Sequence, residues 1–139
     1  MIVIGRSSHP GSATGPVLRL DQPISFWGGV NSEGIIIDVH HPHCGINLKG
    51  KILAMPSGRG SSSATAMLAE LIRNGNAPAA IIMKQNDTIL VIGALVAKEI
   101  YGKSMPIITL QDSEFDKIKN GVVINITAEP QSAHAYITL

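Results

Sequence analysis

The residues best suited to chemistry form a glycine- and serine-rich turn between an apolar run and a helical pattern. The turn contains Gly58, Arg59, Gly60, Ser61, Ser62 and Ser63. The apolar run 51–55 predicts a strand before it, and apolar residues at helical spacing predict a helix over 63–74 after it. A helix N-terminus presents free N–H groups to an anion, and arginine adds a planar pair of donors. The turn therefore predicts an anion site with a hydroxyl group beside it.

The same residue types also suit a purely structural turn. Serine is a preferred helix N-cap, and glycine opens tight turns without any ligand. The segment is not a nucleotide-binding P-loop, because no lysine precedes the hydroxyl residues and the glycine spacing differs. It is not a nucleophile elbow either, because Gly-x-Ser-x-Gly is absent. The residues of the turn alone leave the catalytic and the capping interpretation open.

Two further segments offer candidate ligand contacts. Gly28 and Gly29 follow two aromatic residues, and they either let the backbone approach a ligand or form a tight turn beside a core anchor. His40 and His41 belong to a His-His-Pro-His-Cys run, which we interpret as a loop that faces a substrate or partner. The run lacks the spacing of a metal site, so we expect no metal bound by this chain. His9 and His134 stand alone and are expected at the surface.

Composition limits the possible partners and the location. The 139 residues suit a single domain, 1–139, of which 45% of the residues are hydrophobic and only 15% are charged. Because soluble domains usually carry about 25% charged residues, part of the surface is expected to be covered by a partner. A net charge of +1 gives no electrostatic case for nucleic acid or an anionic membrane. A single cysteine and the lack of a long apolar run predict a reducing, cytoplasmic setting away from the membrane.

The pattern of apolar runs predicts a layered α/β domain. A loop is expected over 7–14, and extended segments over 2–4, 15–20, 24–27, 35–37, 51–55, 79–83, 88–92, 106–110, 121–127 and 134–138. Helices are expected over 63–74, 94–101 and 112–119. Continuous apolar strands such as 79–83 imply burial on both faces of a sheet. A β/β/α or three-layer α/β domain satisfies this requirement.

Several separated motifs, in order, resemble the small swivelling domain of aconitase X. They are Ile24–Val30, Ile36–Pro42, Pro56–Ser63, Asn74–Ile82 and Ile100–Ile107, and the likeness extends over about 15–110. The resemblance implies a swivelling β/β/α three-layer domain of the aconitase superfamily. It also implies a small subunit, or a fused domain, that works beside a larger aconitase X subunit. That larger subunit carries the iron or iron–sulfur cluster, so this chain is expected to be inactive alone.

The family's activities are dehydrations of hydroxy acids. The Pro-Ser-Gly-Arg-Gly-Ser form of the turn is similar to that of bacterial members, which dehydrate cis-3-hydroxy-L-proline. The alternatives are the archaeal reaction on 5-phosphomevalonate and, in another class, a non-catalytic interaction module. The family's catalytic serine maps onto Ser61, with Ser62 as the other candidate base. Arg59 and the turn backbone would hold the acidic group of the substrate, and Gly58 stands where a second serine is expected. The substrate-binding residues expected in all are Gly58, Arg59, Gly60, Ser62, Gly28, Gly29, His40 and His41.

Overall fold

The strands close into one barrel that is parallel on one side and antiparallel on the other. The computed structural model describes residues 1–58 and 62–139. In these residues the strands run in the order β1-β5-β4-β3-β2-β6-β7 and close on themselves. Their bounds are β1 Ile2–His9, β2 Gly11–Arg19, β3 Ile52–Met55, β4 Ala80–Met83, β5 Ile107–Thr109, β6 Val123–Ala128 and β7 His134–Thr138. Strands β2 to β5 pair in parallel, and the remaining neighbours pair antiparallel.

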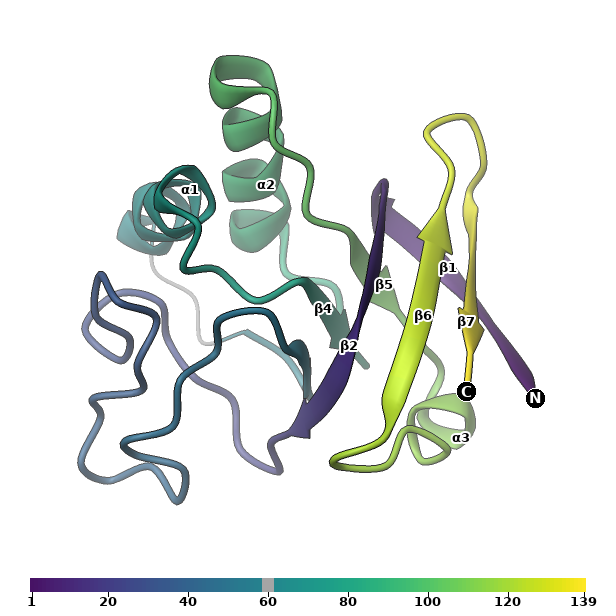
Figure 1. Cartoon of the computed structure of the whole chain (residues 1–139), viewed down its shortest axis with the longest axis horizontal. Helices are drawn as coiled ribbons and strands as arrows, with labels where there is room; N and C mark the ends of the chain where they lie inside the picture. The colour runs from purple at the N-terminus through teal and green to yellow at the C-terminus, as the bar shows by residue number, and fades with distance from the viewer. Residues whose placement is uncertain (59–61) are drawn as a thin grey trace.

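Two long helices cover the parallel side of the barrel (Figure 1). α1, Ser63–Asn74, follows β3, and α2, Thr88–Tyr101, follows β4, whereas the short α3, Asp112–Phe115, follows β5. The first turns of the two long helices are tied together, because the Thr65 hydroxyl donates to the Ile89 carbonyl at 3.0 Å. Gly93 lets the helices approach, since a Cβ there would lie 2.9 Å from the Thr65 carbonyl oxygen.

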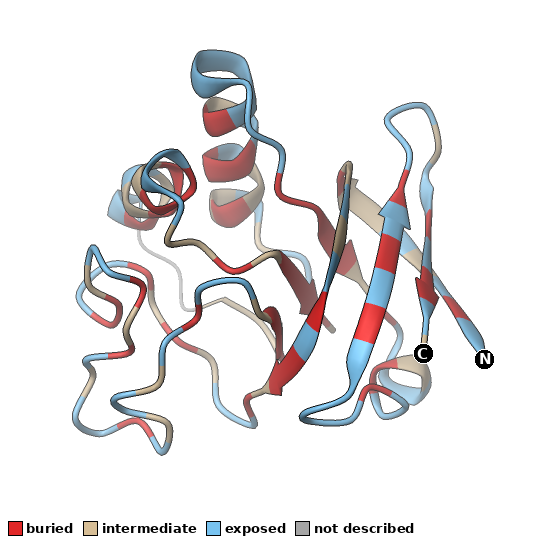
Figure 2. Ribbon diagram, viewed as in Figure 1, coloured by how far each residue is buried: buried red, intermediate tan, exposed pale blue. Residues whose placement is uncertain are grey.

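The layers follow from which faces of the strands are buried. All residues of β3 and β4 are buried, whereas β6 alternates buried and exposed residues (Figure 2). Within β3, Leu53 and Met55 pack in the cluster under the helices, and Ile52 and Ala54 pack in the cluster inside the barrel. The order of layers is therefore helices, parallel wall and antiparallel wall. This arrangement confirms the α/β class and the burial of the parallel strands on both faces.

Helix α1 spans the residues that its apolar pattern predicts. It ends at Gly75, which has the left-handed φ of 79° expected of a helix C-cap glycine. By contrast, the extended segment expected over 88–92 is wrong, because these residues form the start of α2. Asp87 decides this outcome, since its side chain accepts a hydrogen bond from the Ile89 N–H at 2.9 Å and so caps the helix.

The loop expected over 7–14 is also wrong. β1 continues to His9 and β2 begins at Gly11, so only Pro10 separates them. The backbone of this polar segment pairs with β5 and β6. The local sequence does not indicate this pairing, because both partner strands lie about 100 residues further along the chain. In the opposite sense, the extended segments expected over 24–27 and 35–37 form no strand, and the bridges there are isolated. Their apolar residues, among them Phe26 and Ile36, are nevertheless buried against the helix layer.

His9 is buried, which corrects the surface position expected from its sequence. Only 5% of it is exposed, and the ring Nδ1 lies 3.2 Å from the Met105 carbonyl oxygen. Because that carbonyl can only accept, Nδ1 carries the proton and donates it. Burial lowers the pKa of His9 below its usual value of 6.5, against the smaller raising effect of this hydrogen bond.

The depressed pKa of His9 predicts loss of stability in acid. Between its folded-state pKa and 6.5 the unfolded chain binds more protons, so the free energy of unfolding rises with pH in that window. The contribution of His9 is complete above pH 6.5 and disappears as the pH falls through the folded-state pKa. Urea unfolding at several pH values should show a shallower dependence for His9→Asn than for wild type. The exposed His134→Asn serves as control, and equal slopes for His9→Asn and wild type would contradict this prediction.

Candidate functional site

The glycine- and serine-rich turn begins at the edge of the sheet where the parallel strands end. β3 and β4 run in parallel register, so the segments that follow them leave from the same edge. The Pro56 carbonyl accepts hydrogen bonds from the backbone N–H groups of Lys84 at 3.0 Å and Gln85 at 3.1 Å. The turn after β4 therefore holds the start of the turn after β3. Ligands of parallel α/β sheets bind at this carboxyl edge, which makes it the candidate site.

Gly58 packs directly against the cap of helix α2. A Cβ built at Gly58 would lie 2.0 Å from Oδ2 of Asp87 and 3.1 Å from Cδ1 of Leu90. No side chain fits there without displacing the Asp87 carboxylate. Asp87 was not among the residues expected at the site, although an acidic residue before an apolar run is a sequence signal for a helix N-cap.

The centre of the turn is not among the described residues. Arg59, Gly60 and Ser61 lie outside the described residues, so their catalytic and anion-binding roles stay predictions. Ser62 is the N-cap residue of α1, and its exposed side chain makes no capping hydrogen bond with the described residues. The first turn of α1 contains no acidic residue. Ser62 is thus not used as a side-chain cap, and no carboxylate in the first turn offsets the positive end of the helix dipole.

His41 is buried and links the loop around residues 38–45 to Gln22 by a hydrogen bond. It is 6% exposed, its Nδ1 accepts the His43 N–H at 3.0 Å, and its Nε2 lies 3.1 Å from the Gln22 carbonyl oxygen. Nδ1 accepts, so Nε2 carries the proton and donates it to Gln22. His40 is exposed, and its N–H donates to Oδ1 of Asp38 at 2.9 Å. Contact of either histidine with a substrate stays a prediction, and His40 has the more accessible ring.

Gly28 and Gly29 belong to a tight turn and directly follow a buried and an exposed aromatic residue. Phe26 is buried, whereas Trp27 is 61% exposed. Gly28 has a φ of 80° and open space at its Cβ position. A Cβ at Gly29 would lie 2.4 Å from the Ser25 carbonyl oxygen, so this position admits only glycine. The geometry explains both glycines by the turn itself, and their predicted contact with a ligand is untested.

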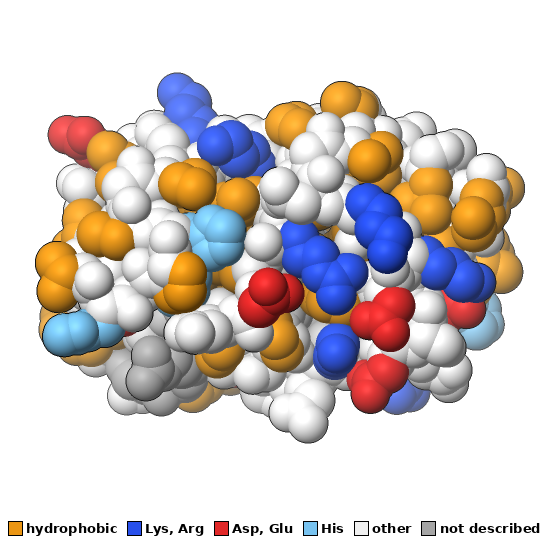
Figure 3. All heavy atoms as spheres, turned by 90° about the horizontal axis from the view of Figure 1, so that it is seen from below, with side chains coloured by type: hydrophobic (Ala, Val, Ile, Leu, Met, Phe, Trp, Pro, Cys, Tyr) orange, Lys and Arg blue, Asp and Glu red, His pale blue; other side chains and the backbone are white. Residues whose placement is uncertain are grey.

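Basic side chains gather near the middle of the face seen in Figure 3, interspersed with acidic ones. Arg19, the last residue of β2, donates to the carbonyl oxygens of Phe115 at 3.2 Å and Ile118 at 2.8 Å. Its guanidinium lies 4.7 Å from the centroid of the Phe115 ring, and Nζ of Lys84 lies 5.3 Å from the same centroid. These contacts fix α3 against the ends of β2 and β4.

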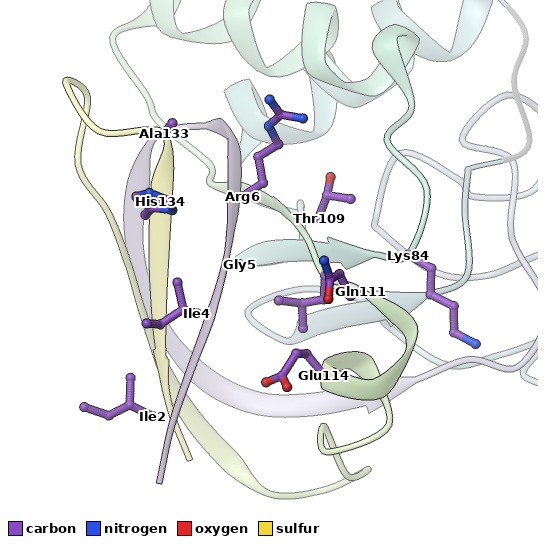
Figure 4. Close-up of a pocket in the computed structure, with 11 residues that line it drawn as sticks. Ile2, Ile4, Gly5, Arg6, Lys84, Thr109, Gln111, Glu114, Ala133 and His134 are labelled. Atoms are coloured by element: carbon purple, nitrogen blue, oxygen red, sulfur yellow. The ribbon is translucent and has the colours of Figure 1, made fainter.

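A cavity of about 800 Å³ opens next to Lys84 (Figure 4). Its lining combines Ile2, Ile4 and Arg6 of β1 and His134 of β7 with Thr109, Gln111 and Glu114 from β5 and the segment that follows it. No sequence pattern indicates this cavity, because β1, β7 and α3 are brought together only by closure of the barrel. Lys84 belongs to both places, since it lines the cavity and its N–H donates a hydrogen bond to the Pro56 carbonyl.

Across residues 1–58 and 62–139, no three His, Cys, Asp or Glu side chains converge as metal ligands. Cys44 is a free, exposed thiol. The described helices also include none with the length and hydropathy needed to cross a membrane.

The fold and the ordered motifs correspond to a known class of protein. The family model of the aconitase X swivel domain matches residues 2–135, and the chain therefore belongs to that family. Over its whole length it also matches the crystal structure of aconitase X from Thermococcus kodakaraensis in the holo-form. That match has a TM-score of 0.83 at 31% identity and covers 99% of the other chain. The family and the three-layer fold expected from the sequence are thereby confirmed.

Two groups of dehydratases are similar to this chain in sequence. Cis-3-hydroxy-L-proline dehydratase from Pseudomonas aeruginosa is 44% identical over 84% of this chain, and its counterpart from Hypocrea jecorina is 42% identical over 78%. The chain spans only 20% and 18% of the length of these two relatives. The phosphomevalonate dehydratase small subunit of Thermococcus sibiricus is 36% identical, and the match covers 90% of this chain and 91% of the relative.

Proposed function

We propose that residues 1–139 act as one swivel domain, the small subunit of a hydro-lyase that removes water from a hydroxy acid. Cis-3-hydroxy-L-proline is the favoured substrate, because the hydroxyproline dehydratase from Pseudomonas aeruginosa is 44% identical to this chain. The observation that carries the proposal is the position of the turn. It starts at the carboxyl edge of the parallel strands and leads into a helix N-terminus without an acidic residue or a side-chain cap at Ser62.

The proposed reaction needs a base that accepts a proton and a site that binds the carboxylate of the substrate. Loss of water β to a carboxylate requires a base that removes the α-proton. Ser61 is the proposed base, and a serine alkoxide needs nearby N–H groups and positive charge for its stabilisation. Arg59 is proposed to bind the substrate carboxylate with its two parallel donors. The N-terminus of α1, whose first residue is Ser63, supplies further N–H groups.

The departure of the hydroxyl group is proposed to depend on a larger subunit with an iron or iron–sulfur centre. The described residues do not fit such a centre themselves, because they offer no set of three convergent ligands. The low charged fraction of 15% supports a surface partly covered by this partner. The single exposed Cys44 is compatible with the proposed cytoplasmic location.

A second candidate substrate is 5-phosphomevalonate. It is supported by the phosphomevalonate dehydratase small subunit of Thermococcus sibiricus, which is 36% identical to this chain over 90% of its residues. Both candidates carry a carboxylate, so either could occupy the proposed anion site. A non-catalytic interaction module remains the competing class of function.

Reconstitution with the larger subunit from the same organism tests the proposal. We expect the two chains to co-purify and the complex to dehydrate cis-3-hydroxy-L-proline, whereas each chain alone should be inactive. Product formation is measured with each hydroxy acid in parallel. Exclusive turnover of 5-phosphomevalonate would select the second candidate. A complex that forms but dehydrates neither acid would favour the interaction module.

A further inference from the structure

We propose that Asp87 is a positioning residue for the turn that contains the proposed base. Its carboxylate would fix Gly58 from the neighbouring helix and thereby set the path of the backbone into the proposed catalytic segment. The inference rests on the proposed function, but its geometric part concerns described residues only.

The two carboxylate oxygens of Asp87 make different contacts, one with helix α2 and one with Gly58. Oδ1 accepts the Ile89 N–H at 2.9 Å and anchors the carboxylate at the start of α2. Oδ2 occupies the space that a side chain at position 58 would need, 2.0 Å from the ideal Cβ, and the carboxyl carbon lies 2.9 Å from that point. The carboxylate is thus held on one side and packs against Gly58 on the other. Rotation of the side chain away from Gly58 would break the helix cap.

Other contacts make this a rigid point of attachment. The Pro56 carbonyl is held by the N–H groups of Lys84 and Gln85, in the same turn that contains Asp87. The first turn of α2 is bound to the first turn of α1 through Thr65 and Ile89. The two described ends of the turn from β3 to α1 are therefore held by residues 84–89, which form the turn after β4 and the start of α2. The packing of Asp87 on Gly58 adds a contact at the residue immediately before Arg59.

Such a contact should affect turnover more than folding. A displacement of about 1 Å in a catalytic group can cost roughly 100-fold in rate. Glycine retains most of the stability of an acidic N-cap, so Asp87→Gly removes the contact with Gly58 while largely preserving α2. Asp87→Asn keeps both the cap and the shape of the carboxylate. The pair therefore separates loss of packing from loss of charge.

The experiment is a double-mutant cycle in the reconstituted enzyme, with the substrate that the wild type turns over. Asp87→Gly should lower kcat by about 10- to 100-fold with KM changed less than about threefold, whereas Asp87→Asn should stay within about threefold of wild type. Gly58→Ala should lower Tm by about 5 °C in the wild type and by clearly less in the Asp87→Gly background, where the carboxylate is absent although Leu90 stays close.

Each outcome bears on a separate part of the inference. Additive Tm changes in the cycle would overturn the contact between Asp87 and Gly58. Equal losses of kcat in Asp87→Asn and Asp87→Gly would show that charge, not position, is required. Normal kcat in Asp87→Gly would overturn the positioning role. A wild-type complex that dehydrates neither acid would instead overturn the proposed function, and the catalytic part of this inference with it.

Discussion

Ser61→Ala is expected to lower kcat of the reconstituted enzyme by about 10²–10⁴-fold, because a general base contributes an effect of that size. The melting temperature should change little, since Ser62 and not Ser61 is the N-cap residue of α1. A purely structural serine would behave in the opposite way, with about 1 kcal/mol lost in stability and chemistry near normal. Turnover and Tm measured on the same variant therefore separate the two roles.

Ser62→Ala and Ser63→Ala are the matched controls for Ser61→Ala. Ser62 makes no side-chain cap with the described residues and Ser63 begins the helix, so neither replacement should lower Tm much. If Ser61 is the base, both should reduce turnover far less than Ser61→Ala does. If Ser62→Ala shows the large loss instead, the base is the neighbouring hydroxyl. A Ser61→Ala enzyme that melts lower but turns over normally would show that Ser61 is structural.

Arg59→Ala is expected to raise KM by roughly 10- to 100-fold, because a hydrogen bond to a charged group contributes about 1.5–3 kcal/mol. Arg59→Lys retains the charge but not the two parallel donors, so it should show a smaller rise in KM. The measurement is steady-state kinetics on the preferred hydroxy acid, with KM and kcat determined separately.

Arg73→Lys is a suitable control for Arg59→Lys. Arg73 lies in the last turn of α1 and pairs with Glu70, at the end of the helix opposite the candidate site. Its replacement should leave KM unchanged. Equal kinetics of Arg59→Ala and wild type would exclude Arg59 from the anion site, while leaving the proton-transfer role of Ser61 open to its own test.

The sequence by itself determined helix α1, the burial of the central parallel strands and the family. Helix α1 and its C-cap at Gly75 follow from apolar residues at helical spacing and a glycine, which act within a few residues of each other. The continuous apolar runs of β3 and β4 predict burial on both faces because no polar residue interrupts them. The ordered motifs likewise identified the swivel-domain family, and the match over residues 2–135 confirms it.

Only the tertiary structure decided the features that depend on contacts between distant residues. Burial of His9 requires Met105, and the cavity beside Lys84 requires closure of β1 onto β5 and β7. The sequence showed Gly58 as a candidate substrate contact and as a departure from an expected serine, whereas the fold places the Asp87 carboxylate where a side chain at position 58 would lie. No local pattern contains this information, because residues 58 and 87 meet only when β3 and β4 pair in register and α2 begins beside the turn.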